Sequence, residues 1–262
     1  MFGVVPKSIW KKSNPPDENN LCDWAMRCLL IEDGNKLILI DNGIGDKQDE
    51  KFLSHYYLRG ETNIVHALST AGFSPNDITD MFLTHLHFDH CGGGVIRKGD
   101  TFHLTFQKAR YWSNPEHWDW ATRPNPREKA SFIPENIFPM KESGNVNFID
   151  LSKPSPFSQF EIFAASGHTD KMMIPMIRYN GKTICFMADL LPSTGHIPLP
   201  YIMGYDTRPL ITLEEKERFL GEAADKQYIL FLEHDPVNEC CTVKRTEKGV
   251  RLDQAFKLSD IL

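Results

Sequence analysis

The chain has 262 residues, of which 41% are hydrophobic and 24% are charged, values typical of a globular protein with a sizeable core. Its formal net charge is -6 and it has no block of Lys and Arg, which argues against a nucleic-acid partner. No apolar run approaches the roughly 18 residues that a membrane span needs, so no membrane partner is expected. We expect residues 1–262 to form a single domain.

Short apolar runs recur along the chain, and each is followed by a side chain that can bind a metal. In chain order they are KLILI before Asp41, MFLT before His85, FEIFAAS and Gly167 before His168, TICFMA before Asp189, and YILFLE before His234. Such runs are too short for helices and predict buried strands. A side chain at a strand end is held by a rigid sheet and stays accessible, which suits a functional site.

Helix and turn signals lie between these runs. Residues 61–73 have apolar side chains at helical spacing, and residues 212–226 open with Thr212 and Glu215 at the spacing of a capping box. Two dipeptides predict hairpin turns: Asp33-Gly34 and Asn180-Gly181. Strands, interspersed helices and hairpins together indicate an α/β fold with a mixed sheet covered by helices.

The segment 111–140 differs from the rest of the chain. It contains three of the five tryptophans and five prolines, and it shows no strand pattern. We interpret it as an aromatic-rich insertion that is partly helical. The cluster of Trp112, Trp118 and Trp120 in this segment could line an apolar pocket for a substrate, contact a second copy in a homodimer, or form the core of the insertion.

The motif HLHFDH, followed by three glycines, carries the clearest chemistry. His85 and His87 are two residues apart, so in an extended chain their side chains point the same way and can bind one ion. Asp89 and His90 follow where the chain must turn, and can face a second ion. Three imidazoles and a carboxylate so close together resist burial without a metal. The motif therefore predicts a site with two metal ions.

Two ions need more ligands than this motif holds, and the strand ends supply His168, Asp189 and His234. A lone His or Asp beside a strand is usually structural, but the two oxygens of Asp189 could bridge both ions. Nitrogen and oxygen ligands without a thiolate suit Zn²⁺, with Mn²⁺ or Fe²⁺ as alternatives. Paired ions about 3.5–4 Å apart share a water, and Zn²⁺ lowers the pKa of a bound water to about 7, so a hydroxide nucleophile is available.

These motifs resemble the hydrolases of the metallo-β-lactamase superfamily. The resemblance extends from about Leu29 to His234, with His168 in SGHT, Asp189 in FMAD and His234 in LEHD. It implies a four-layer αββα sandwich, in which two mixed sheets face each other with helices on the outside. Within the family, the ligand spacing and the stretches VPKSIW and LIDNGIG are most similar to the N-acyl homoserine lactonases, including quorum-quenching lactonases.

The resemblance also implies a role for each ligand. One ion would be held by His85, His87 and His168, the other by Asp89, His90 and His234, and both by the bridging Asp189. Asp89 would in addition pass a proton to the leaving group. Asp41 would support the HLHFDH loop by hydrogen bonds.

The chain departs from the best-known lactonases at one substrate contact. Those enzymes carry a tyrosine three residues after the bridging aspartate, and here Pro192 stands in that place. His196 in the following loop could replace the tyrosine, or it could simply lie on a surface loop. The bridging Asp189 counts against β-lactam cleavage, because β-lactamases of the histidine-only subclass lack it.

We therefore expect a dinuclear metal hydrolase that opens a lactone or related carboxylic ester, a small molecule like an N-acyl homoserine lactone, by attack of the bridging hydroxide. The alternative on the same site is phosphotriester or phosphodiester cleavage. A rival of another class is a metal-dependent binding or redox protein that hydrolyses nothing.

The six cysteines form no CxxC pair and no spacing typical of a disulfide framework, which predicts reduced thiols and a cytoplasmic protein. The N-terminal stretch agrees with this expectation, because Pro6 interrupts its only apolar patch and its charges follow that patch, the wrong order for a secretory signal.

Overall fold

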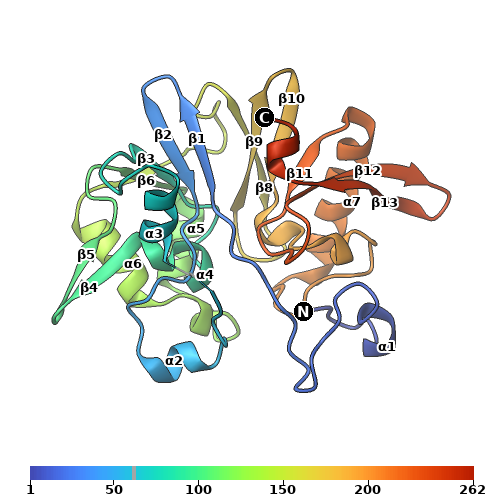
Figure 1. Ribbon diagram of the computed structural model, residues 1–262, viewed down its shortest axis with the longest axis horizontal. Helices are drawn as coiled ribbons and strands as arrows, with labels where there is room; N and C mark the ends of the chain where they lie inside the picture. Colours follow the sequence, from blue (N-terminus) through green and yellow to red (C-terminus); the bar gives the residue numbers. More distant parts are fainter. Residues whose placement is uncertain (61–62) are drawn as a thin grey trace. The chain divides into compact units, whose positions relative to one another are not determined.

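The structure is a computed structural model, and it describes residues 1–60 and 63–262 (Figure 1). The chain divides into two compact units. The motif unit comprises Cys28–Asp150 and contains HLHFDH; the C-terminal unit comprises Met1–Arg27 and Leu151–Leu262. Two compact units can belong to one domain, so the single domain expected for residues 1–262 stays a prediction.

The motif unit contains a five-stranded mixed sheet. Its strand order is β1 (Leu29–Asp33), β2 (Lys36–Ile40), β3 (Asp80–Phe82), β6 (Arg110–Ser113) and β7 (Val146–Phe148). The first two strands form the antiparallel hairpin predicted at Asp33-Gly34, and the other pairs are parallel. A separate antiparallel pair consists of β4 (Val95–Lys98) and β5 (Thr101–Leu104).

An apolar core lies between the sheet and most of the helices of this unit. The helices are α2 (Glu50–Ser54), α3 (Ile64–Thr70), α4 (Phe88–Cys91), α5 (Pro115–Thr122) and α6 (Pro134–Glu142), with short 3-10 turns at Gly92–Gly94 and Lys129–Ser131. Met81 on β3, Leu68 on α3, Trp118 on α5 and Met140 on α6 belong to one buried cluster. The helix predicted over 61–73 is α3; residues 61–62 lie outside the described part of the chain.

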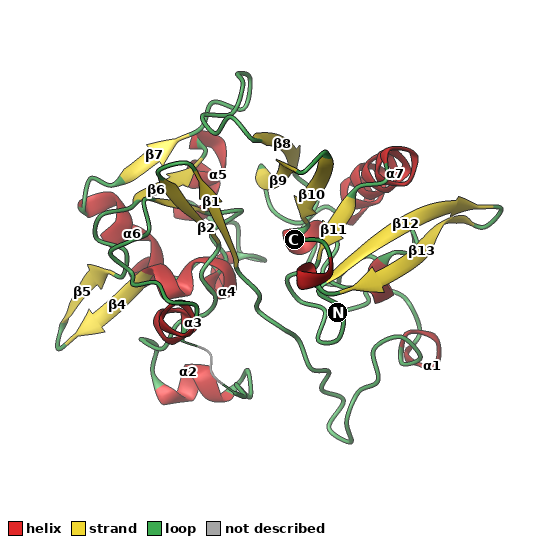
Figure 2. Cartoon of the chain, turned by 45° about the horizontal axis from the view of Figure 1, so that its top comes forward, coloured by secondary structure: helices red, strands yellow, loops and turns green. Residues whose placement is uncertain are grey.

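The C-terminal unit contains a six-stranded mixed sheet. Its order is β13 (Gly249–Phe256), β12 (Cys240–Thr246), β11 (Ile229–Phe231), β10 (Lys182–Phe186), β9 (Met172–Tyr179) and β8 (Phe160–Ala165). Only β10 and β11 pair in parallel. Asn180 and Gly181 have φ values of 47° and 74°, as the predicted β9–β10 hairpin requires of its two central residues. Strands β12 and β13 form an antiparallel hairpin, drawn as two neighbouring arrows in Figure 2.

The long helix of this unit, α7 (Pro209–Lys226), packs on β12 with Phe219, Leu220 and Ala223 buried. The other helical segments are α1 (Lys7–Trp10) and the 3-10 turns Ala188–Leu190, Thr194–His196 and Leu258–Asp260.

Two local predictions were wrong. The capping box at Thr212 does not form, because α7 begins earlier, at Pro209, and the Glu215 carboxylate instead accepts hydrogen bonds from the backbone N–H groups of Ser166 and Gly167 at 2.7 and 3.0 Å. The segment 111–140 is partly helical as expected, but Tyr111–Ser113 belong to β6, which pairs with β3 and β7. That strand is short and aromatic, so it shows no period-two alternation.

The prediction of an α/β fold with mixed sheets and helices is confirmed. All six cysteines are free thiols, and four of them are buried. In the described part of the chain, no helix is both long enough and apolar enough to cross a membrane.

Candidate metal centre

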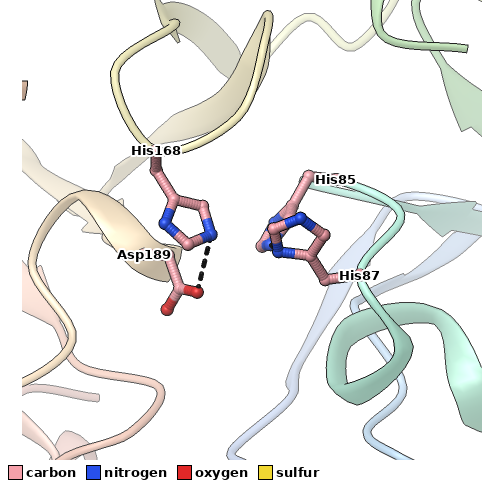
Figure 3. Close-up of side chains that lie close together, drawn as sticks. All are labelled: His85, His87, His168 and Asp189. Carbon is pink, nitrogen blue, oxygen red and sulfur yellow. Dashed lines mark hydrogen bonds and ion pairs between the residues drawn. The ribbon is translucent and has the colours of Figure 1, made fainter. Parts of the chain in front are cut away.

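His85 and His87 lie on the extended stretch that leaves β3, and His87 precedes the first turn of α4. The Nε2 atom of His85 lies 3.1 Å from the Nδ1 atom of His87, as the two rings in Figure 3 illustrate. Two nitrogens that each sit about 2.0–2.1 Å from one Zn²⁺ ion are themselves roughly 3–3.5 Å apart. The pair is therefore spaced to bind one ion, and both side chains are buried.

Asp41 ties the motif to the end of β2 through buried hydrogen bonds. Its carboxylate accepts from the backbone N–H of Thr84 at 2.8 Å and from the Thr84 hydroxyl at 2.6 Å. The same carboxylate lies 3.0 Å from Nδ1 of His90, which leaves Nε2 of His90 facing Asp89 at 3.9 Å. These contacts fit the supporting role expected of Asp41, whose effect on a bound metal stays a prediction.

The glycines after the motif are required by close packing against the loop that follows Asp41. A Cβ atom on Gly92 would lie 2.1 Å from the carbonyl oxygen of Ile44, and one on Gly93 would lie 2.2 Å from that of Asn42. No larger residue fits without moving the backbone. The glycine run therefore lets the 42–45 loop press against the motif and hold it in place.

In the C-terminal unit, Asp189 lies between two histidines. Its Oδ2 atom is 3.0 Å from Nε2 of His168, the contact marked in Figure 3, and its Oδ1 atom is 3.1 Å from Nε2 of His234. Ala188, with a φ of 40°, turns the chain sharply after β10 and directs Asp189 to this position. One oxygen of Asp189 thus lies close to each histidine, and its role as a bridging ligand stays a prediction.

The other ring nitrogens of these two histidines are also occupied. Nδ1 of His168 lies 2.9 Å from the buried carboxylate of Asp206, and Nδ1 of His234 donates to the carbonyl oxygen of Ala25 at 2.7 Å. Because Asp206 and the Ala25 carbonyl each contact Nδ1, it is the Nε2 atom of His168 and of His234 that could bind a metal. Burial lowers the pKa of His168, but Asp189 and Asp206 outweigh it and raise that pKa to about 10. A bound cation would take the place of this proton.

The residues that could hold a metal ion in the described part of the chain include all seven predicted ligands. Several buried side chains around them were not predicted, among them Asp206 beside His168, Glu128 beside His87, and His117, which accepts the backbone N–H of Leu86 between His85 and His87. Each lies 31 or more positions away in the chain from the residue it contacts, so no local motif marks it. All three are buried polar side chains, and burial of this kind can be recognised only in the structure.

The predicted substrate contacts lie in two different surroundings. His196 is buried, stacks on Phe2 with ring centroids 4.3 Å apart, and lines a small cavity together with Asp189 and Pro192. Burial, helped by the nearby positive charge of Lys216, lowers the pKa of His196 to about 3, so its ring is neutral. Its role toward a substrate stays a prediction.

Trp118 and Trp120, the two predicted substrate contacts of the segment 111–140, also differ from each other. Trp118 is buried in the core of the motif unit and contacts Phe148 edge to face. Trp120 is half-buried and donates its indole N–H to Glu128 at 2.7 Å. Their roles in a pocket or a dimer stay predictions.

Lys216 holds the loop that carries His196. Its ammonium group is buried and donates hydrogen bonds to the carbonyl oxygens of His196, Pro198 and Tyr201 at 2.8, 3.1 and 2.9 Å. Burial lowers the pKa of Lys216 to about 7, yet three acceptors match the three N–H groups of the charged form. One side chain of α7 thus joins three carbonyl groups of this loop.

Lys216→Met is expected to lower the free energy of unfolding by about 2–4 kcal/mol, because it removes the ammonium donor from the carbonyl groups of His196, Pro198 and Tyr201. Urea unfolding followed by circular dichroism measures this change. Lys226→Met is the matched control on α7. Lys226 contacts Glu222 and Tyr228 at an exposed position, so this substitution should cost less than about 0.5 kcal/mol. Equal stability of the two variants would contradict the role of Lys216.

Known proteins resemble this chain at several levels. The sequence profile of the metallo-beta-lactamase superfamily matches residues 27–234. An N-acyl homoserine lactonase of Bacillus cereus is 31% identical over 102 residues, which cover 35% of this chain and 40% of that protein. An N-acyl homoserine lactonase of Bacillus thuringiensis is 32% identical over 84 residues, which cover 28% of this chain and 32% of that protein. The chain thus spans well under half the length of these curated relatives.

Solved structures match over more of the chain. A probable metal-dependent hydrolase from Staphylococcus aureus has 27% identity and a TM-score of 0.87, with 100% of this chain and 92% of that chain covered. AidC, described as a dizinc quorum-quenching lactonase in complex with a product, has 26% identity and a TM-score of 0.75, covering 89% and 81%. These relatives confirm the predicted fold and support hydrolase activity. The profile match covers most of the sequence, and with the ligand motifs in place it shows that the chain belongs to the metallo-β-lactamase superfamily.

Proposed function

We propose that the protein is a dinuclear metal hydrolase that opens lactones or related carboxylic esters, with N-acyl homoserine lactones as the substrate class. The observation that carries this proposal is the carboxylate of Asp189, whose two oxygens lie 3.0 and 3.1 Å from Nε2 of His168 and of His234. A carboxylate that serves two histidines in this way is the ligand that two ions would share.

The donor set fits two divalent ions, held as the sequence motifs imply: one by His85, His87 and His168, one by Asp89, His90 and His234, with Asp189 shared. Nitrogen and oxygen donors without a thiolate suit zinc, and AidC is described as a dizinc enzyme. When bound, the ions would supply an activated water at neutral pH and would polarise the ester carbonyl.

The chain's own residues would position the metal ligands and would protonate the leaving group. Asp41 fixes His90 and Thr84, and Asp206 fixes the ring of His168, so that the ligand nitrogens do not have to be reordered when an ion arrives. Asp89 is the least buried of the predicted ligands, with a side chain that is 31% exposed, and can therefore reach a substrate. It would deliver a proton to the departing alkoxide.

An aromatic cluster beside Asp89 favours a substrate with an apolar tail. Phe88, the neighbour of Asp89, lies 5.5 Å from Phe52 and 4.9 Å from Tyr56 between ring centroids, and Tyr56 is 42% exposed. The net charge of -6 disfavours a polyanionic substrate. Such a surface suits the acyl chain of a neutral lactone better than a phosphodiester.

The test is a panel of homoserine lactones with short, medium and long acyl chains, together with a phosphotriester and a phosphodiester. Burial of about 100 Å² of acyl chain would contribute roughly 2.5 kcal/mol, so kcat/KM should rise at least several-fold from the shortest chain to the longest. Tyr56→Ala should flatten this rise, whereas the control Tyr57→Ala, at a residue that is 61% exposed, should not. Metal-loaded protein that cleaves the phosphotriester and ignores every lactone would replace this proposal by the phosphoesterase alternative.

Other expectations from the sequence stay predictions under this proposal. They are a quorum-quenching role, a cytoplasmic location suggested by the free thiols, a homodimer, and the absence of nucleic-acid and membrane partners.

A further inference from the structure

The two ring nitrogens of His87 have different surroundings. Nδ1 lies 3.1 Å from Nε2 of His85, and Nε2 lies 3.0 Å from Oε1 of Glu128. A neutral imidazole has one N–H donor and one lone pair. Since a carboxylate oxygen only accepts, the geometry places the proton on Nε2 and leaves the Nδ1 lone pair beside His85.

Glu128 is itself held by its neighbours in the segment 111–140. Its carboxylate is buried, with 3% of the residue exposed. Its second oxygen, Oε2, accepts the indole N–H of Trp120 at 2.7 Å and the side-chain amide of Asn125 at 3.1 Å. Three N–H groups therefore converge on one buried carboxylate and fix both its position and its orientation.

A second residue of the segment, His117, fixes the backbone between the two histidines. Its Nε2 atom accepts the backbone N–H of Leu86 at 2.9 Å, and Asn114 caps the helix that carries it by accepting the backbone N–H of His117 at 2.8 Å. The segment 111–140 thus contacts the His-x-His stretch both at its backbone and at the ring of His87.

We propose that Glu128 is a positioning residue for metal binding: it holds His87 as the tautomer that carries its proton on Nε2, and it strengthens Nδ1 as a ligand. This inference rests on the proposed metal site and assigns a task to the segment 111–140 other than substrate contact. A carboxylate partner on a ligand histidine raises the basicity of the ring, and loss of such a partner typically lowers metal affinity about 10–100-fold.

The experiment compares Glu128→Gln with Glu116→Gln, a matched change at an exposed glutamate of α5. Zinc affinity is measured by competition with a chromophoric chelator, independently of any activity. Glu128→Gln should weaken one of the two ions about 10–100-fold and leave the other near wild type, while Glu116→Gln should change neither. The ¹⁵N resonances of the His87 ring in zinc-loaded protein should show a protonated Nε2 and a metal-bound Nδ1.

Trp120→Phe is the second variant, in case Glu128→Gln does not fold. It keeps an aromatic ring and removes only the N–H that fixes Oε2, so it should weaken the same ion by a smaller factor. A substrate-contact role for Trp120 would instead change KM and leave zinc affinity unaltered. Wild-type zinc affinity in either folded variant, or a metal-bound Nε2 on His87, would overturn the positioning role.

The same experiment separates this inference from the proposed function. Wild-type protein that binds two ions and hydrolyses no lactone would refute the substrate class. The zinc affinity of Glu128→Gln would still test whether Glu128 positions His87. Urea unfolding of chelator-treated protein shows whether the variants are merely less stable. An affinity loss that is fully matched by unfolding of the metal-free variant would count against the positioning role.

Discussion

Replacing Asp189 by Asn is expected to lower the affinity for both metal ions by roughly 100-fold or more and to reduce ester hydrolysis to less than about one hundredth of the wild-type rate. The physical reason is that the two oxygens of this carboxylate contact different histidines. Oδ2 lies 3.0 Å from Nε2 of His168, and Oδ1 lies 3.1 Å from Nε2 of His234. An amide has one oxygen and one NH₂ group, and it carries no charge. It can replace at most one of the two contacts.

Elemental analysis of protein purified without chelator measures this effect, and the wild type should contain about two ions per chain. His85→Ala should remove mainly one ion, which distinguishes a terminal ligand from a shared one. Asp100→Asn, at a fully exposed carboxylate of the motif unit, is the control and should retain both ions. A value near one ion in fully active wild-type protein would rule out the bridging role of Asp189.

The strands that lead to the metal ligands could be predicted from the sequence, because buried strands leave a direct mark. Both TICFMA and YILFLE are apolar runs that end at a polar residue, and the structure has β10 before Asp189 and β11 before His234. The glycine run after HLHFDH was equally informative, since Gly92 and Gly93 leave no room for a side chain.

The contacts around the ligands could not be predicted in this way. Glu128 meets His87 across 41 positions of sequence, and Asp206 meets His168 across 38. No local spacing encodes such pairs, because they depend on how loops return to the sheet. The wrong capping box at Thr212 has a related cause: the carboxylate of Glu215 binds the backbone before His168, a distant contact that local spacing could not reveal.

Local sequence therefore predicts which residues can bind a metal, and tertiary structure decides how each is oriented. His87 illustrates the division. Its place in HLHFDH predicts a ligand, whereas the contact with Glu128 supports Nδ1 as the nitrogen that would bind. The same holds for His234, whose Nδ1 is committed to the carbonyl oxygen of Ala25.

Asp89→Asn is expected to lower kcat for lactones by about 10²–10⁴-fold, the range that general acid catalysis contributes. Asp89 lies in the first turn of α4, 31% exposed beside the fully buried His90, so its carboxylate can contact a substrate while its neighbour cannot. Asn keeps the size and one oxygen of Asp but cannot carry a proton to a leaving alkoxide. The loss should therefore depend on the leaving group.

Lactones and aryl esters with an activated phenol provide the comparison, because a phenolate of low basicity departs without a proton. Metal content is measured in parallel, so that a variant that has lost an ion is recognised and reloaded before the kinetics. With both ions present, Asp89→Asn should be strongly impaired on lactones and much less impaired on the activated esters. If the loss is the same for both leaving groups, then Asp89 acts only as a ligand, and the proton that the alkoxide needs must come from elsewhere.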